Sequence, residues 1–202
     1  PPSPPYIAEC PCSPTTRRYI AGAVLTVLHG MSRLPMVARV TLTDYRGFVI
    51  YDSYVRPTSP VTDYRTAETG LTAQHIASAP PFPEVQQRVA TMLRGKILIG
   101  YGLWEFLSVM GLSHPAIDTR DAALFLPFRR SLHYRSNVQV PLVTLVNRFM
   151  GRNIGLHGDF PVEHARAALD LFRSCEQVWE GVIAAGSWPC ALPPDAYANC
   201  FV

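Results

Sequence analysis

The chain has 202 residues, of which 48% are hydrophobic and 16% are charged, and its formal net charge is +3 at pH 7. This length suits a single domain with a core of its own. So small a positive charge does not by itself require a nucleic-acid partner. No apolar run has the length of a membrane span and no signal-peptide pattern is present, so we expect no membrane association and a soluble intracellular protein.

The beginning of the chain is rich in proline and starts with Pro1 rather than Met. We therefore expect residues 1–18 to be an arm or linker that joins this domain to an upstream segment. A polyproline ligand for another protein is the alternative. Residues 19–185 are expected to form the domain, and residues 186–202 a C-terminal tail packed on the domain or at an interface.

The chain contains five cysteines, an odd number that argues against a disulfide framework. Cys175 falls within an apolar helical pattern and is expected in the core. A zinc ion shared by Cys10, Cys12, Cys190 and Cys200 is an alternative, although their spacing matches no familiar zinc pattern.

Three strands are expected at the start of the domain. Residues 22–28 form a nearly continuous apolar run, which is typical of a strand buried on both faces. Residues 36–43 and 47–55 alternate and are rich in β-branched or aromatic side chains. The short stretch 44–47 between them indicates a hairpin turn, so the three strands are expected to be antiparallel.

Helices dominate the rest of the chain. Val85, Val89, Met92 and Leu93 recur on one helical face, and Gly95 is placed to end that helix. Residues 96–100 are expected as a short buried strand, and residues 103–110 and 141–151 as helices. A last helix is expected after Pro161. This order predicts an α/β fold class with a mixed central sheet flanked by helices.

Four strings occur in the order in which a known family has them. They are ARVTLTDYRGFVIYDSYVRPTSPVTDYRTAETGL (38–72), VQQRVATMLRGKILIGY (85–101), RDAALFLPF (120–128) and VEHARAALDLF (162–172) followed by VWE (178–180). Together they resemble the RNA exonuclease 4 branch of the DEDDh 3′–5′ exonucleases. The resemblance covers roughly residues 22–180 and implies a ribonuclease-H-like fold.

The resemblance also implies a chemistry. An active member holds two divalent metals with an Asp and a Glu on the first strand, an Asp on a middle helix and an Asp on the last helix. A His just before the last Asp activates water. Two such metals clamp the attacking and leaving oxygens of a phosphodiester, and Mg²⁺ takes oxygen ligands.

All five of these positions are interpreted as substituted. If AVLTVLHG (23–30) corresponds to the family's first strand, Leu25 and Val27 stand at its Asp and Glu. In GYGLWEFL (100–107), Phe106 stands at the middle Asp. In DFPVEHA (159–165), Asp159 and His164 stand at the His and the last Asp. These residues predict a catalytically inactive site, no metal and no cofactor.

Leu25 and Val27 are two residues apart on a strand and share one face, so we expect them to meet Phe106 in an apolar plug. Glu105 is expected to turn away, because one helical position rotates a side chain by about 100°. Asp159 and His164 are expected at a helix N-terminus, or as an acid–imidazole pair. A relocated metal site of His157, Asp159 and His164 is a further alternative.

The favoured hypothesis is a protein-interaction or scaffolding module without enzymatic activity, with a protein partner or a second copy of the chain. Trp188, Tyr197 and Phe201 are its candidate interface anchors. The alternatives are a non-cleaving RNA or single-strand binder, or a residual exonuclease. Candidates for nucleic-acid binding are Arg129, Arg130, Tyr134 and Arg135. The resemblance also implies a nuclear location.

Overall fold

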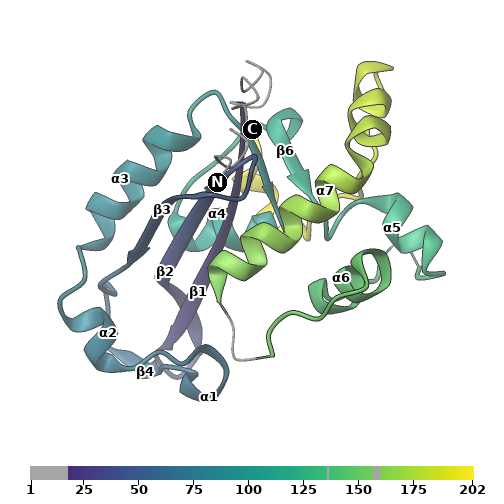
Figure 1. Ribbon diagram of the computed structural model, residues 1–202. Coiled ribbons are helices and arrows are strands. Elements are labelled where there is room, and N and C mark those ends of the chain that lie inside the picture. Colours follow the sequence, from purple (N-terminus) through teal and green to yellow (C-terminus); the bar gives the residue numbers. More distant parts are fainter. Residues whose placement is uncertain (1–17, 136, 157–159) are drawn as a thin grey trace, which may run out of the picture.

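The computed structural model describes residues 18–135, 137–156 and 160–202 (Figure 1). Their six-stranded sheet has the order β3-β2-β1-β5-β6, with β4 paired to β1. The strands are β1 (Tyr19–His29), β2 (Leu34–Asp44), β3 (Val49–Tyr54), β4 (Val61–Asp63), β5 (Ile97–Gly100) and β6 (Thr119–Asp121). β1, β2 and β3 pair antiparallel, whereas β5 and β6 run parallel to β1. The predicted mixed sheet is confirmed.

The turn between β2 and β3 lies where the sequence predicts it. The Asp44 carboxylate accepts hydrogen bonds from the backbone N–H groups of Arg46 and Phe48, each at 2.9 Å. Gly47 has a φ of 85°, a conformation that glycine adopts without steric cost. The side chain of Asp44 therefore closes the hairpin in the way typical of Asp in tight turns.

The helices are α1 (Thr66–Thr69), α2 (Ala73–Ala77), α3 (Phe82–Leu93), α4 (Leu103–Met110), α5 (Leu126–Ser131), α6 (Leu142–Met150) and α7 (Pro161–Ala184). The four longest are the predicted ones, and α4 has the predicted bounds. The short helices α1, α2 and α5 and the strands β4 and β6 were not predicted, because segments of three to six residues carry too little periodicity. None of the helices in the described ranges is long and apolar enough to cross a membrane.

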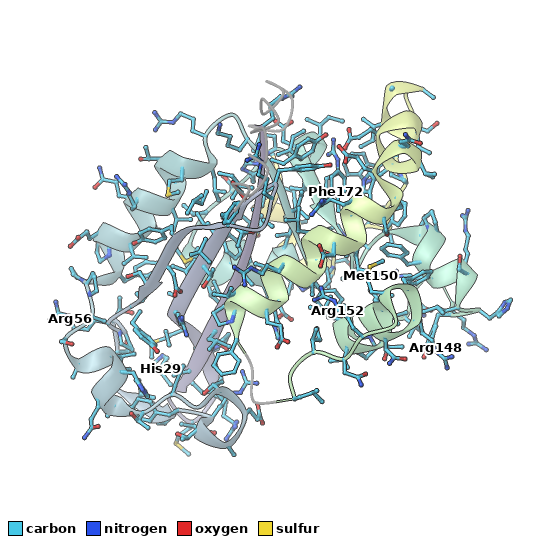
Figure 2. The ribbon with its side chains drawn as sticks, in the orientation of Figure 1. His29, Arg56, Arg148, Met150, Arg152 and Phe172 are labelled. Atoms are coloured by element: carbon cyan, nitrogen blue, oxygen red, sulfur yellow. The ribbon has the colours of Figure 1, made fainter. Side chains whose placement is uncertain are left out.

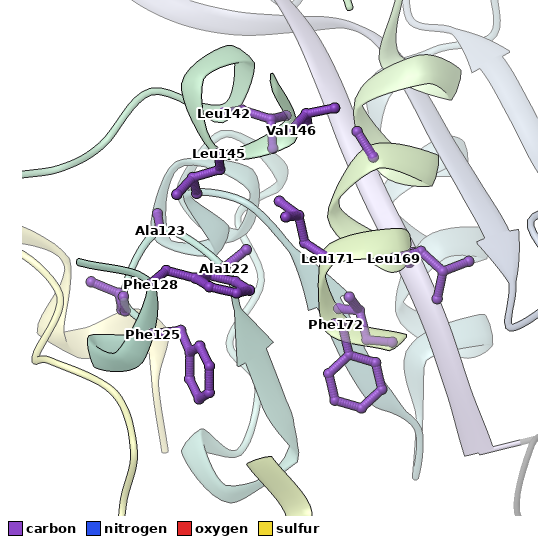
Figure 3. Packing of buried hydrophobic residues seen from close by; sticks show 14 of the residues in the cluster. Ala122, Ala123, Phe125, Phe128, Leu142, Leu145, Val146, Leu169, Leu171 and Phe172 are labelled. Atoms are coloured by element: carbon purple, nitrogen blue, oxygen red, sulfur yellow. The ribbon is translucent and has the colours of Figure 1, made fainter. Parts of the chain in front are cut away.

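The two faces of the sheet have separate cores. Tyr19 and Ala21 pack on the side of α7, where Phe125, Phe128 and Phe172 gather with residues of α6 (Figure 3). Ile20 points to the opposite face and belongs to the cluster of α3 and α4. This alternation follows from the two-residue period of a strand. Burial of each large side chain contributes roughly 1.5–3 kcal/mol, so both layers hold the sheet in place.

Helix α7 crosses one face of the sheet (Figure 1). Pro161 occupies its first turn, where a missing N–H has no consequence. The helix is interrupted at Cys175, whose φ of −132° and ψ of 15° are not helical. Beyond this kink Trp179 stacks on Phe125, with ring centroids 3.9 Å apart. Phe172 points inward from α7, while Arg148 lies at the exposed end of α6 (Figure 2).

The C-terminal tail packs on its own domain. Backbone hydrogen bonds join Ala191 to Leu124 at 2.8 Å and His114 to Cys200 at 3.0 Å. Tyr197 and Phe201 are partly buried against the two cores. Trp188 alone of the three expected interface anchors is exposed, at 38%.

Candidate functional site

A cleft of about 220 Å³ opens beside β1, at the start of α4. It is lined by residues of β1, of the turn into α4, and of α4, α6 and α7: Gly22, Ala23, Val24, Tyr101, Gly102, Glu105, Phe106, Leu142 and His164. The resemblance assigns the phosphodiester chemistry to the first strand, a middle helix and the last helix. The cleft lies where β1, α4 and α7 meet, so it is the candidate functional site.

The cleft forms because two parallel strands separate. β1 and β5 pair as far as Ala21 and Ile99. β5 then ends at Gly100, and the chain turns into α4 instead of following β1. A β-carbon at Gly100 would clash with the Leu103 side chain and would stand 3.1 Å from the Gly22 carbonyl oxygen. Glycine therefore allows the turn to lie close to β1 without displacing the Leu103 side chain.

We predicted that Leu25, Val27 and Phe106 meet in one apolar plug. That prediction is wrong for the two strand residues, Leu25 and Val27. Leu25 and Val27 are buried in a separate cluster with Leu71 and Ile76. Phe106 belongs to the cluster of α3 and α4, and its ring faces Gly22. A register shift in the β1–β2 pairing between Leu25 and Thr26 separates the two halves of β1. The strand residues at the cleft are therefore Gly22, Ala23 and Val24.

Two ionisable side chains of the cleft come from different helices. Glu105 is exposed at the start of α4, and His164 is partly buried in the first turn of α7. The expectation that Glu105 turns away from the site is wrong, because the cleft is wide enough to be lined by Glu105 and Phe106 together. Glu105 was predicted to lie outside the site because a single helical position was assumed to face it.

Tyr101 forms a wall of the cleft rather than an acid or a base. Its hydroxyl donates a hydrogen bond to the Val140 carbonyl at 2.8 Å and accepts one from Gln139 Nε2 at 3.2 Å. Burial raises the pKa of Tyr101 to about 12, so the phenol keeps its proton at neutral pH. These bonds join the end of the 132–140 segment to the cleft.

Asp121 lies behind the cleft, at the end of β6. Its carboxylate accepts hydrogen bonds from the backbone N–H groups of Gly102 and Leu103, at 2.9 and 2.7 Å. Asp121 is 3% exposed. Burial raises the pKa of Asp121 to about 6, although three backbone N–H groups and Arg129 act in the opposite direction.

The described residues do not fit a two-metal centre. No group of three His, Cys, Asp or Glu side chains that could hold a metal occurs within residues 18–135, 137–156 and 160–202. The cleft offers one carboxylate, from Glu105, and one imidazole, from His164, whereas two divalent cations need several oxygen ligands. His157 and Asp159 of the alternative metal site lie outside the described residues.

Two of the four cysteines of the alternative zinc site, Cys10 and Cys12, lie outside the described residues. The other two, Cys190 and Cys200, are buried free thiols.

The nucleic-acid candidates divide into one buried and three exposed residues. Arg129 is only 5% exposed, and its Nε donates a hydrogen bond to the Ala123 carbonyl at 3.1 Å. The prediction that Arg129 contacts nucleic acid is therefore wrong. Arg130, Tyr134 and Arg135 are exposed. Arg130 lies in α5, whereas Tyr134 and Arg135 lie in the 132–140 segment, whose end Tyr101 joins to the cleft.

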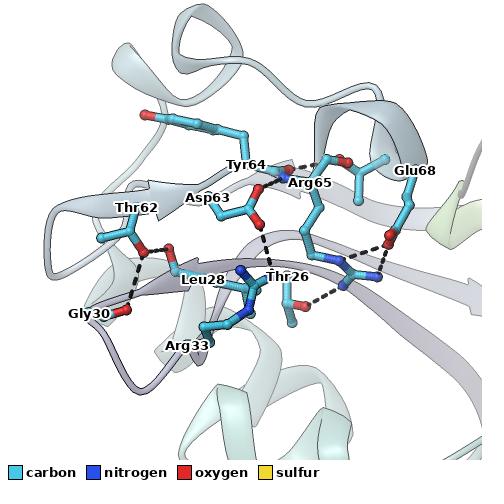
Figure 4. Close-up of polar contacts among 10 residues, drawn as sticks. Thr26, Leu28, Gly30, Arg33, Thr62, Asp63, Tyr64, Arg65 and Glu68 are labelled. Atoms are coloured by element: carbon cyan, nitrogen blue, oxygen red, sulfur yellow. Dashed lines mark hydrogen bonds and ion pairs between the residues drawn. The ribbon is translucent and has the colours of Figure 1, made fainter.

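Residues 60–66 (PVTDYRT), part of the first resembling string, form a polar connection to β1 (Figure 4). Asp63 accepts hydrogen bonds from the Arg33 guanidinium at 2.9 Å and from the Arg65 N–H at 2.7 Å. Arg65 in turn donates to Thr26 Oγ1 at 3.3 Å and to Glu68. These bonds hold the segment before α1 against β1, so the string has a structural role here.

Residues 25–113 match the Exonuclease family. The Homo sapiens apoptosis-enhancing nuclease is 34% identical over 160 residues, which are 78% of this chain and 49% of the relative. The Neurospora crassa RNA exonuclease 4 is 41% identical over 138 residues, which are 68% of this chain and 33% of the relative. The chain thus spans about half or less of these relatives.

Solved structures confirm the ribonuclease-H-like fold. The Neurospora crassa Pan2 catalytic unit, with its protease and nuclease domains, superimposes with a TM-score of 0.68 at 19% identity, over 85% of this chain and 28% of that one. The Saccharomyces cerevisiae Pan2 exonuclease module in complex with A7 RNA gives a TM-score of 0.68 at 20% identity, over 84% of this chain and 31% of that one.

These relatives contradict the expectation of a scaffold without enzymatic activity, since they are named as nucleases and exonucleases. The structure also removes part of the evidence on which that expectation rested. Leu25 and Val27 do not line the cleft, and Asp159 lies outside the described residues. Loss of the catalytic machinery is therefore not shown.

Proposed function

We propose that this chain is the nuclease domain of a longer protein and acts on the end of a nucleic-acid strand that enters the cleft beside β1. One observation carries the proposal: Glu105 of α4 and His164 of α7 line the same cleft of the first strand. The names of the relatives, a nuclease and an RNA exonuclease, support RNA as the substrate.

The reaction would be hydrolysis of the terminal phosphodiester bond. Hydrolysis requires a group that accepts a proton from water and a group that stabilises the charge developing on the phosphate. Glu105 can accept a proton as a carboxylate. His164, when protonated, can donate a hydrogen bond to a phosphate oxygen. Tyr101 and Phe106 would bound the space for the terminal nucleotide.

The rest of the strand would leave the cleft along the end of α5 and the segment after it. Arg130 and Arg135 can contact phosphates, and Tyr134 can stack on a base. The bonds of Tyr101 to Gln139 and Val140 support this route, because they join this segment to the cleft wall. A nuclear location, which the resemblance implies, belongs to the same proposal.

A strand-shortening assay tests the proposal. Single-stranded RNA labelled at its 5′ end is incubated with the purified chain, with added Mg²⁺ or Mn²⁺ and separately with a chelator. We expect products shortened from the 3′ end, and a loss of at least about tenfold in rate for Glu105→Gln and for His164→Ala.

Glu84→Gln, which changes an exposed carboxylate on α3, is the matched control and should keep the wild-type rate. RNA that stays intact at every enzyme concentration would contradict the proposed activity. Equal rates for the two cleft variants and the control would contradict the assignment of the site.

A further inference from the structure

Helix α4 begins without a capping side chain of its own. The residue before it is Gly102, which has no side chain and a φ of 67°. Helix N-termini leave backbone N–H groups without partners inside the helix. Here Asp121 supplies the acceptors from another element, with Oδ1 at 2.9 Å from the Gly102 N and Oδ2 at 2.7 Å from the Leu103 N.

We infer that Asp121 is a positioning residue of the cleft, which fixes the first turn of α4 and thereby holds Glu105 beside β1. The fixing of the turn is independent of the proposed function, whereas its effect on ligand binding rests on that function. The connection is short. The N–H groups of Glu105 and Phe106 both donate to the Gly102 carbonyl, at 2.9 and 3.4 Å.

The turn is also tightly packed. A β-carbon at Gly100 would clash with the Leu103 side chain and would stand 3.1 Å from the Gly22 carbonyl oxygen. Asp121 also accepts the Ala123 N–H at 2.9 Å, so its carboxylate holds the chain after β6 as well as α4. A displacement of the carboxylate would therefore move both walls of this junction.

The charge of the anchor is sensitive to pH. The ionisable groups that interact with Asp121 are Arg129 of α5, Tyr101 before α4 and Cys190 of the tail. Because burial raises the pKa of Asp121 to about 6, the carboxylate is protonated in mildly acidic solution. Protonation replaces an acceptor with a donor at a site surrounded by N–H groups, so it weakens the anchor.

The test compares Asp121→Asn with Asp195→Asn, a change of an exposed carboxylate in the tail. The Asn side chain keeps the shape of Asp but presents an NH₂ group to the N–H donors. We expect the amide hydrogens of Gly102 and Leu103 to exchange about tenfold faster in Asp121→Asn and at the wild-type rate in Asp195→Asn.

A second readout uses the wild-type protein, so it does not depend on whether a variant folds. In the wild type, the backbone amide NMR signals of Gly102, Leu103 and Ala123 should shift together with a midpoint at about pH 6. Independent behaviour of the three signals would overturn the inference, as would unchanged exchange in Asp121→Asn.

The third readout is the affinity for a short fluorescent single-stranded RNA. Asp121→Asn should weaken binding about tenfold at pH 7.5, and the wild-type advantage should shrink as the pH falls through 6. An affinity equal to that of the wild type would overturn the positioning role. If the wild type binds no RNA, the proposed function fails, while the amide signals still decide whether Asp121 anchors α4.

Discussion

The ring of Phe106 lies against Gly22, with its Cε2 atom 3.1 Å from the point where a β-carbon of residue 22 would stand. This contact joins the start of α4 to β1 and sets the apolar side of the cleft. It requires a very small residue on the strand, since Leu42 Cδ2 is equally close to the same point.

The Gly22 contact predicts a steric penalty for a larger residue. Gly22→Val should lower the free energy of unfolding by about 1–3 kcal/mol, because added carbons in a packed core force neighbouring side chains apart. Urea denaturation measures the change. Gly181→Ala on α7 is the control and should be neutral or slightly stabilising, since nothing lies within 4 Å of its β-carbon position. Unchanged stability of Gly22→Val would contradict the packing described.

The ion pair between Arg120 and Glu180 predicts that the fold is destabilised when the buried Arg120 guanidinium loses its carboxylate partner. Arg120 is 3% exposed on its side chain, and its two hydrogen bonds to Glu180 are 2.6 and 2.9 Å long. Glu180→Ala should therefore destabilise the fold by about 3 kcal/mol, since it leaves a buried charge without its counter-ion. Asp170→Ala breaks a surface pair with Arg152 and should cost less than about 1 kcal/mol. Thermal unfolding of the two variants side by side checks the contrast.

Asp121 predicts a pH dependence of stability with a defined sign. Its folded pKa of about 6 lies above the ordinary value of 3.8, so the folded state binds more protons between these values. The contribution of Asp121 to the free energy of unfolding is fully present below pH 4 and is lost as the pH rises through 6. The wild type should lose about 3 kcal/mol relative to Asp121→Asn over this range. Denaturation of both proteins from pH 4 to pH 7 measures the difference, and parallel curves would refute it.

The arginines of α5 and of the segment after it predict two different phenotypes. The double change Arg130→Glu and Arg135→Glu should weaken binding of single-stranded RNA and reduce its salt dependence by roughly 0.7 in log–log slope for each phosphate that is no longer neutralised. Stability should not change, since both residues are exposed. Arg129→Ala should instead destabilise the fold by about 2 kcal/mol, because it removes buried hydrogen bonds to Ala123. Fluorescence anisotropy at several salt concentrations, with a melting curve for each variant, separates the two outcomes.

The long elements could be predicted because each has its own periodicity. The apolar positions Val85, Val89 and Leu93 of α3 recur at helical spacing, and all three are buried. The hairpin between β2 and β3 was predictable from its Asp and Gly residues. Resemblance in four ordered strings gave the exonuclease fold, which periodicity alone does not select.

The site could be predicted only in part, because its geometry depends on contacts between distant segments. The apolar run of β1 contains no local signal that Gly22, rather than Leu25, faces α4. That choice depends on the pairing of Ala21 with Ile99 and on the register shift after Leu25. Likewise, nothing near Asp121 in the sequence indicates that its carboxylate anchors another helix.

The most direct test of the proposed function follows single-stranded RNA, labelled at its 5′ end, with wild-type protein, Glu105→Gln and Glu84→Gln in one experiment. We expect progressive 3′ shortening by the wild type and by Glu84→Gln, and a rate reduced by about tenfold or more for Glu105→Gln. RNA left at full length by the wild type, with and without divalent cations, would contradict the proposed function.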